Sequence, residues 1–372
     1  MALAELRPTE LAFCSSASSF LQSDFWGSFK SRFGWKAYSF CAEWKETNEN
    51  AGKLALPFLV LYRRLGPGIG FVYIPWGPEL PPVYNTAECY KAAVDLAPVL
   101  RSLLPKDTAL IRFDFPWFIE TDLSGADNFR RHFTRSVADV QPPDSVLVDL
   151  TPCENAILAN MKSKWRYNIG LAEKKGVSVR SISTAAIAAG AENLESYYRL
   201  YKETAKRDGI TIHGIEYYTA LFEEAVKYGV DVRLYMASHE DEDIAGIVTL
   251  FRGCESVYLY GASSSRKRNL MAPYALQWKA MQDAKAAGCI FYDMFGIPPR
   301  SPEDDPNHAM AGLYRFKTGF IGDNKEGGRI VRRPGSWDYG CRPLIMAFYS
   351  AAEKTRKKIW DIKKQLKRRS KN

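Results

Sequence analysis

Two aromatic-rich segments late in the chain combine residue types that bind and polarise polar groups. The segment GLYRFKTGF places Lys317 directly after Phe316, and a lysine ammonium acts as a compact point charge on a phosphate or an oxyanion. The segment VYLYG alternates Tyr258 and Tyr260 around Leu259, so we expect both phenols on one side of a strand. Lys317 equally fits an exposed place on a hairpin beside a core phenylalanine.

Two aspartates each end a strand-like run. Asp114 closes TALIRFD, and Asp293 closes CIFYD. The carboxyl ends of strands are where ligand sites form in α/β proteins, which makes Asp114 a candidate binding residue. Either carboxylate also fits a structural role, capping the turn after its strand, and for Asp293 we favour that interpretation.

The segment ENAILANMKSKWRYNIGLAEKKGVSV, residues 154–179, is basic. Its cations are Lys162, Lys164, Arg166, Lys174 and Lys175, and its acids are Glu154 and Glu173. We expect one helix that Gly176 stops, followed by a strand. Its basic face fits a contact surface for nucleic acid and equally an ordinary solvated helix face.

The net charge of +9 resides in residues 354–372, which hold ten Lys or Arg against Asp361 alone and leave 41 basic and 41 acidic residues elsewhere. The cations include Lys363, Lys364, Lys367 and Arg368. Ile359, Ile362 and Leu366 recur at helical spacing, which predicts a helix with a thin apolar stripe. Such a block suits a polyanion such as RNA, the anionic face of a membrane, or merely a solvated tail.

Length and composition indicate a large intracellular protein. A chain of 372 residues exceeds the usual size of one domain and favours two lobes. Its seven cysteines are scattered without a CxxC pair, which favours core residues in a reducing compartment over disulfides or zinc ligands. No basic segment followed by an apolar run opens the chain, and no apolar stretch reaches roughly 18 residues. We expect it to be cytoplasmic.

One supersecondary unit occurs twice in the predicted elements. Strand-like runs at 58–62 and 70–75 precede a helix at 87–104 and a strand that ends at Asp114. Strands at 232–237, 244–251 and 256–261 precede a helix at 272–287 and a strand that ends at Asp293. Two copies of one α/β unit, each with a mixed sheet, are the economical interpretation.

The order of strand, helix and strand resembles acetyl-coenzyme A dependent N-acetyltransferases. Their glycine-rich turn before the helix binds the cofactor pyrophosphate through backbone amides. The corresponding turn here, SSSRKRNLMAPYA, has no G-x-G and contains Pro273, which has no amide hydrogen to donate. We therefore do not expect coenzyme A as the donor.

Several blocks resemble, in sequence order, those of the Fem family of tRNA-dependent peptidoglycan peptidyltransferases. They are GWK near the start, RFDFP at 112–116, MKSKWRYNIGLAEKKG, APYALQWKAM, FYDMFGIPP and GLYRFKTGF, which span most of residues 30–325. The resemblance implies two tandem acetyltransferase-like (GNAT-type) α/β lobes with mixed sheets flanked by helices. The first lobe would comprise 1–148 plus 330–372, and the second 149–329.

The resemblance also implies a reaction. The side-chain amine of a peptidoglycan stem peptide attacks the ester of an aminoacyl-tRNA and receives alanine, serine or glycine, with no metal or coenzyme. Some family members that act on lipid-linked precursors carry a long helical hairpin, and no heptad-bearing segment here would form one. The chain is therefore similar to compact members, which implies UDP-MurNAc-pentapeptide rather than lipid II as acceptor. We expect a monomer with peripheral contact to the inner membrane face.

Site residues follow from the same motif matches. Lys317 matches the lysine that stabilises the oxyanion or leaving alkoxide, and Phe316 shapes the pocket of the terminal adenosine. Matches to acceptor contacts are Lys36, Asp114, Thr211, Tyr217, Tyr258 and Tyr260. His213 stands where the family has arginine, so a protonated His213 or the nearby Arg207 would supply the phosphate contact. Contacts to tRNA would come from Lys162, Lys164, Arg166, Lys363, Lys364, Lys367 and Arg368.

Two other functions remain open from the sequence. An acyltransferase on the same scaffold would modify a different amine acceptor. A non-enzymatic RNA-binding protein would use the basic tail and the basic 154–179 segment. Paired tyrosines and a two-lobe repeat exceed what a simple RNA-binding module needs.

Overall fold

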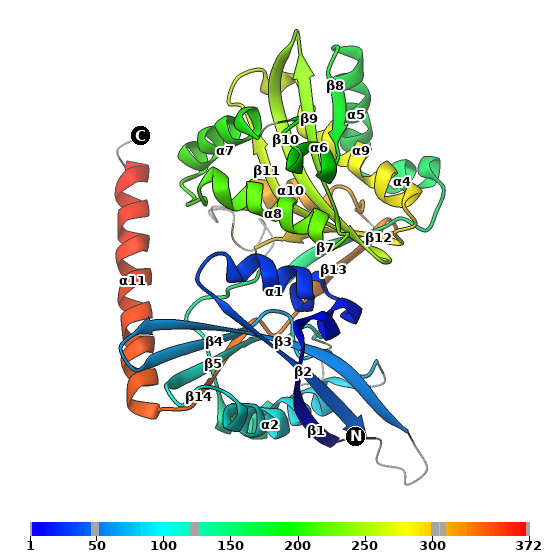
Figure 1. Cartoon of the computed structure of the whole chain (residues 1–372). Helices are drawn as coiled ribbons and strands as arrows, with labels where there is room; N and C mark the ends of the chain where they lie inside the picture. The colour runs from blue at the N-terminus through cyan, green and yellow to red at the C-terminus, as the bar shows by residue number, and fades with distance from the viewer. Residues whose placement is uncertain are drawn as a thin grey trace. The chain divides into compact units, whose positions relative to one another are not determined.

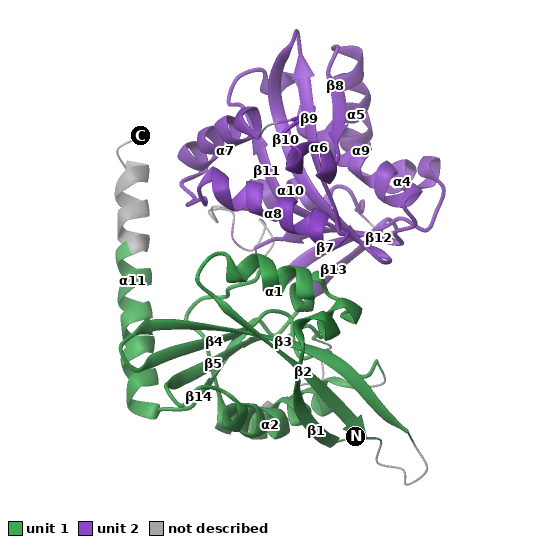
Figure 2. Ribbon diagram, in the orientation of Figure 1, with its two compact units in different colours: residues 1–143, 332–372 green, residues 144–331 purple. Residues whose placement is uncertain are grey.

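The chain folds into two compact α/β units (Figure 2). The computed structural model describes residues 2–45, 52–82, 84–119, 126–192, 194–298, 305, 310–323 and 325–369, with the backbone alone at 126 and 360–369. Unit 1 comprises residues 1–143 and 332–372, and unit 2 comprises residues 144–331. From the sequence we placed these lobes at 1–148 with 330–372 and at 149–329.

Unit 1 is built on a seven-stranded mixed sheet of order β1-β2-β3-β4-β5-β14-β6 (Figure 1). Its strands are β1 (Ala2–Thr9), β2 (Lys36–Lys45), β3 (Lys53–Gly66), β4 (Ile69–Ile74), β5 (Thr108–Asp114), β6 (Phe133–Arg135) and β14 (Ser336–Gly340). All neighbours are antiparallel except β4 and β5, which are parallel. The parallel pair is joined by helix α2 (Thr86–Leu103), as such a pair requires.

Helices cover both faces of this sheet. On one face α2 and α3 (Ala126–His132) bury Tyr90, Leu96 and Phe129 against strand residues such as Phe58 and Val60. Asn85 and Glu88 form a capping box that fixes the start of α2. On the other face lie the short 3-10 helices η1 (Leu11–Ser16) and η2 (Phe20–Gln22), then α1 (Asp24–Ser31) and α11 (Pro343–Arg369).

Unit 2 repeats the plan with a second seven-stranded sheet of order β13-β7-β12-β11-β10-β9-β8. Its strands are β7 (Asp144–Asp149), β8 (Ser178–Ile182), β9 (Asp231–His239), β10 (Glu242–Arg252), β11 (Glu255–Ser263), β12 (Phe291–Gly296) and β13 (Gly328–Arg332). An antiparallel meander again leads to one parallel pair, β11 and β12, joined by α9 (Ala272–Ala286). The predicted internal repeat is confirmed, including the strands that end near Asp114 and Asp293.

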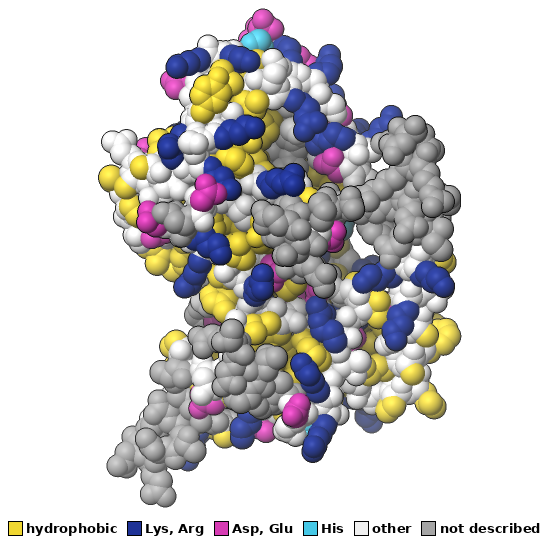
Figure 3. All heavy atoms as spheres, turned by 180° about the vertical axis from the view of Figure 1, so that it is seen from behind, with side chains coloured by type: hydrophobic (Ala, Val, Ile, Leu, Met, Phe, Trp, Pro, Cys, Tyr) yellow, Lys and Arg dark blue, Asp and Glu magenta, His cyan; other side chains and the backbone are white. Residues whose placement is uncertain are grey.

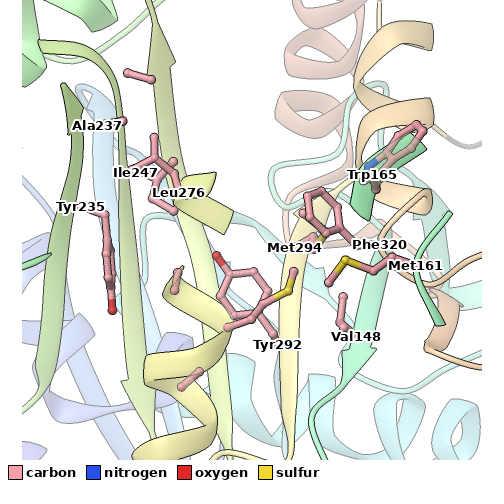
Figure 4. Close-up of a cluster of buried hydrophobic side chains, with 14 of the residues drawn as sticks. Val148, Met161, Trp165, Tyr235, Ala237, Ile247, Leu276, Tyr292, Met294 and Phe320 are labelled. Carbon is pink, nitrogen blue, oxygen red and sulfur yellow. The ribbon is translucent and has the colours of Figure 1, made fainter. Parts of the chain in front are cut away.

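The core of unit 2 lies between its sheet and the helices α5 and α9 (Figure 4). Trp165, Met294 and Phe320 meet there, and Leu276 packs beside Ile247. The helices are α4 (Glu154–Asn160), α5 (Ser163–Lys174), α6 (Thr184–Ala188), α7 (Glu195–Asp208), α8 (Ile215–Lys227), η3 (Arg268–Leu270), α9 and α10 (Ala311–Thr318). Helices α6, α7 and α8 contact β9, β10 and β11 as a second helical layer.

The single basic helix that we predicted across residues 154–175 is wrong. The chain breaks between α4 and α5 because Met161 adopts an extended backbone (φ −69°, ψ 156°) and inserts into the core. The amide of Lys162 then donates to the carbonyl of Gly319 (2.9 Å). Arg166 closes the break by donating to the carbonyls of Ala159 and Met161. In the described residues, no helix has the length and apolar character that a membrane span requires.

A buried ionic cluster fastens α11 to the sheet of unit 1. Arg112 on β5 forms a two-pronged pair with Asp338 on β14, with N–O distances of 2.7 and 2.8 Å. The same guanidinium pairs with Glu353 on α11 at 3.0 and 2.8 Å. Side chains of Arg112 and Asp338 are only 4% and 3% exposed, so each charge depends on its partners.

We predict that Asp338→Asn lowers the free energy of unfolding by about 3 kcal/mol, because it leaves a buried guanidinium partly uncompensated. The matched control is Asp95→Asn, which removes the exposed pair of Lys91 and Asp95 and changes stability by less than about 0.5 kcal/mol. Urea denaturation of the two variants measures the difference. Equal stabilities would contradict a structural role for the cluster.

Candidate functional site

Trp165 on α5 and the FKTG stretch at the end of α10 interlock. The indole Nε1 donates to the carbonyl of Phe316 at 2.8 Å. A Cβ atom built on Gly319 would lie 2.1 Å from the indole ring, so only glycine leaves room for Trp165 there. The ring of Tyr274 packs edge-on against both Trp165 and Phe316 at 5.7 and 5.2 Å. This contact sets where Lys317, between Phe316 and Gly319, points.

Lys317 is buried on α10, which excludes the alternative of an exposed hairpin lysine. Its side chain is 5% exposed, and its Nζ donates to the carbonyls of Phe295 and Gly296 at 3.2 and 2.9 Å. The ammonium also lies 5.2 Å from the ring centre of Tyr258. Burial lowers the pKa of Lys317 to about 7, and the charge of Asp293 opposes that shift.

Asp293 shapes the strand end that holds Lys317. It is fully buried, its Oδ1 accepts from the backbone N–H of Phe295 at 2.7 Å, and it also accepts from the hydroxyl of Ser145. The predicted turn cap at Asp293 is therefore confirmed. Phe295 has a positive φ of 58°, a conformation that the cap supports. Oδ2 of Asp293 accepts no hydrogen bond from the described residues, so the carboxylate keeps an open acceptor.

The expectation that Tyr258 and Tyr260 point to one side is wrong. Their partners on β10 are the adjacent residues Thr249 and Val248, because a bulge at Leu259 shifts the register. Tyr258 packs against the core that faces α9, next to Lys317. Tyr260 points to the other helical layer, where its ring meets Tyr218 of α8 at 5.3 Å.

A second group of predicted residues gathers around α7 and α8. The rings of His213 and Tyr217 stack with their centres 3.8 Å apart. Burial raises the pKa of Tyr217 to about 12, and a side-chain hydrogen bond with Tyr260 opposes that rise. Thr211 and His213 are exposed. Arg207 donates to the carbonyl of Ser263 at 2.9 Å and pairs with its neighbour Asp208, so its guanidinium already serves the fold.

Asp114, in unit 1, is buried and held by protein groups. Its carboxylate accepts from the hydroxyls of Tyr73 (2.5 Å) and Ser336 and from the amide of Gln141 (2.9 Å). Burial raises the pKa of Asp114 to about 6, and those hydrogen bonds oppose the rise. These contacts join β4, β5 and β14. Positioning of an acceptor amine by Asp114 stays a prediction.

Of the remaining predicted contacts, those whose side chains the structure describes reach the surface. Lys36 starts β2, is exposed, and places its Nζ 4.8 Å from the ring of Tyr38. At the start of α5, Lys164 is exposed, Lys162 pairs with Asp323 at 2.6 Å, and Arg166 is bound to backbone carbonyls. The backbone of Lys363, Lys364, Lys367 and Arg368 belongs to α11, and their side chains lie outside the described part of the structure.

Around Lys317 the structure combines a cation, a carboxylate and aromatic rings. A lysine with a pKa near 7 changes its charge near neutral pH, and such perturbed groups mark functional sites. The sequence predicted site roles for Lys317 and Phe316. It predicted none for Trp165, although this residue lies between two of the cations, Lys164 and Arg166, that we expected to bind tRNA. Within the described ranges, no group of three or more His, Cys, Asp or Glu is placed to hold a metal ion.

Repeated mixed sheets, and a buried lysine of α10 whose ammonium lies at the end of β12, define a two-unit α/β protein of the class that the motifs indicated. Residues 131–240 and 232–354 match the model of the FemAB family, and the chain belongs to that family. It shares the fold of the crystal structure of FemX, with a TM-score of 0.72 at 17% identity over 93% of this chain and 100% of that one. The fold class expected from the sequence is confirmed.

Two similar proteins are named transferases. The UDP-N-acetylmuramoylpentapeptide-lysine N(6)-alanyltransferase of Weissella viridescens is 29% identical over 197 residues, which are 51% of this chain and 54% of that protein. The lipid II:glycine glycyltransferase of Staphylococcus saprophyticus is 22% identical over 293 residues, 62% of this chain and 66% of that protein. The chain thus spans between half and two thirds of the length of these relatives.

We predict that Gly319→Ala destabilises the protein by about 1–3 kcal/mol, because the new methyl group collides with the packed indole of Trp165. Gly312→Ala in α10, the helix that ends just before Gly319, is the matched control, since nothing lies within 4 Å of a Cβ there. That control should gain roughly 0.5–1 kcal/mol from the helix preference for alanine. Thermal melts of both variants test the prediction, which fails if they shift alike.

A second prediction concerns the charge on Lys317. Asp293→Asn keeps an oxygen for the Phe295 amide but removes the charge, so the pKa of Lys317 should fall by about one pH unit or more below its present value. The lysine ammonium is then lost at lower pH. The measurement is the titration of the 13Cε resonance of Lys317 in lysine-labelled protein, identified by its absence in Lys317→Met.

The matched control for this titration is Asp243→Asn, which removes a carboxylate of unit 2 that pairs with Arg180. Its effect on the resonance of Lys317 should be negligible. An unchanged titration in Asp293→Asn would show that Asp293 does not set the charge of Lys317.

Proposed function

We propose that this protein is an aminoacyltransferase of peptidoglycan side-chain or cross-bridge synthesis. It moves alanine, serine or glycine from an aminoacyl-tRNA to the side-chain amine of a stem peptide. Support comes from membership of the FemAB family and from the named activities of the two relatives. Charged tRNA and the precursor meet in the cytoplasm, where we place the reaction.

The observation that carries this proposal is the buried ammonium of Lys317 at the end of β12. In the reaction the acceptor amine attacks the ester carbonyl, and negative charge builds on the carbonyl oxygen and then on the departing ribose oxygen. A cation fixed in a dry site stabilises such charge strongly. Lys317 is already desolvated and donates hydrogen bonds to two backbone carbonyls. Its ammonium can therefore exchange a carbonyl for the oxyanion as hydrogen-bond acceptor without first losing water.

Aromatic rings around Lys317 suit the donor end of tRNA. The ring of Phe316 is half-buried and packs against Tyr274 and Phe320 at 5.2 and 5.3 Å. We assign Phe316 to stacking on the terminal adenosine, because a base stacks on an aromatic face without regard to sequence. Lys164, exposed at the start of α5, is the described cation of that segment best placed to meet the phosphates.

For the acceptor we favour UDP-MurNAc-pentapeptide over lipid II. In unit 2 the longest helix of the described part, α9, has 15 residues, which supports a compact member without a helical arm. In unit 2, Thr211, His213, Tyr217 and Tyr260 are proposed to contact this acceptor, and the family motif separately makes Lys36 of unit 1 a proposed contact. Arg207 is proposed to support the contacts of unit 2, since its guanidinium already binds protein groups. Asp114 of unit 1 is proposed to position the acceptor amine.

Lys317→Met should reduce kcat for transfer by at least about 10²-fold while leaving affinity for the precursor within a factor of about three. The fold should persist or gain stability, because methionine fills the buried space without a charge to desolvate. Lys279→Met, which replaces a half-exposed lysine of α9 that pairs with Asp283, serves as control and should transfer at the wild-type rate.

Transfer of label from charged tRNA to the soluble and the lipid-linked precursor, run in parallel, provides the assay. Full activity in Lys317→Met would remove that lysine from the reaction. Label in lipid II alone would overturn the choice of acceptor and retain the reaction.

A further inference from the structure

Helix α11 uses one face to pack on unit 1. Tyr349 stacks on Phe71 of β4 with ring centres 5.9 Å apart. One turn on, Glu353 binds the buried Arg112, and after another turn Lys357 donates to the carbonyl of Val137 at 2.9 Å. Because 349, 353 and 357 are four residues apart, this line defines the side of the helix that the sheet covers.

The opposite face of α11 is apolar and exposed. Leu344 is 88% exposed, Phe348 is 75% exposed and Ile359 is 49% exposed. Ala351, Ala352 and Thr355 lie between them at helical spacing and share a shallow hollow with Phe348 and Ile359. Over this length the face has no acid. We call Leu344, Phe348, Ala351, Ala352, Thr355 and Ile359 the apolar stripe of α11.

Cations flank the apolar stripe. Lys354, Arg356 and Lys358 are exposed on α11, and Figure 3 shows Lys and Arg side chains among hydrophobic ones along the described part of this helix. The sequence from 354 to 372 holds ten Lys or Arg and one acid. A helix with an apolar face and a strongly basic remainder is the pattern of segments that lie in the plane of a membrane interface.

We propose that the apolar stripe of α11 docks on the surface of an anionic lipid bilayer. Leu344 and Phe348 enter the boundary between head groups and acyl chains, and the flanking cations meet the negative head groups. Each cation near an anionic surface contributes to binding, and buried apolar area supplies the rest.

Two other occupants fit the same surface less well. A nucleic acid backbone is bound by cations and leaves Leu344 and Phe348 in water. A second copy of the chain would bring two basic helices together, and like charges repel. Charge complementarity therefore favours lipid. This docking does not depend on the transfer reaction, so binding is measured without substrate.

The test uses the full-length protein and sedimentation with vesicles of phosphatidylglycerol and phosphatidylcholine. Wild-type protein should bind these vesicles and bind pure phosphatidylcholine much more weakly. Leu344→Ser combined with Phe348→Ser should lower the partition coefficient at least about tenfold, because two large apolar side chains no longer leave water. Lys354→Gln with Lys358→Gln should weaken binding in a way that added salt reproduces.

Leu65→Ser is the matched control, since Leu65 is an apolar residue of unit 1 that is 49% exposed outside α11. It should bind vesicles like the wild type, and unchanged melting temperatures would show that all variants fold. Equal vesicle binding by wild type and the Leu344/Phe348 double variant overturns the proposal. So does a stripe-dependent dimer in sedimentation, or stripe-dependent binding of uncharged tRNA without vesicle binding.

Discussion

The contact between Trp165 and the end of α10 is the constraint on which the site depends. The indole needs the empty space at Gly319, and its N–H fixes the carbonyl of Phe316. Lys317 lies between these two points, and its side chain extends toward the carbonyls at the end of β12. Gly319 also accepts a hydrogen bond from the Lys162 amide, which ties the break before α5 to the end of α10. The packing around Trp165 thus fixes the position of Lys317.

The buried cations Arg112 of unit 1 and Lys317 of unit 2 differ in the groups that compensate their charges. In unit 1 Arg112 is matched by two carboxylates, which makes a fully satisfied structural cluster. In unit 2 Lys317 is bound by backbone carbonyls, and Asp293 keeps an open oxygen. A buried charge without a full set of partners lowers stability, and such groups persist where function uses them. The charge of Lys317 is therefore less fully compensated than that of Arg112.

Much of the fold followed from the sequence because its signals are local. Strand runs that end at Asp114 and Asp293, with a helix before each, predicted the repeated α/β unit. Long-range packing could not be predicted from the sequence. The bulge at Leu259 turns Tyr258 and Tyr260 to opposite faces of the sheet, and Met161 breaks the predicted helix by entering the core. Neither effect leaves a pattern in the residues nearby. Family motifs named Lys317, while its burial and lowered pKa came from contacts distant in sequence.

The proposed function depends above all on one point: that this FemAB-family protein takes its donor from tRNA. A competition between donors tests it most directly: alanyl-, seryl- and glycyl-tRNA, each labelled in the amino acid, against labelled acetyl-coenzyme A, with UDP-MurNAc-pentapeptide as acceptor. Label should move to the precursor from at least one charged tRNA, and removal of the tRNA by ribonuclease beforehand should abolish it. Transfer of acetyl label, with none from any charged tRNA, would contradict the account.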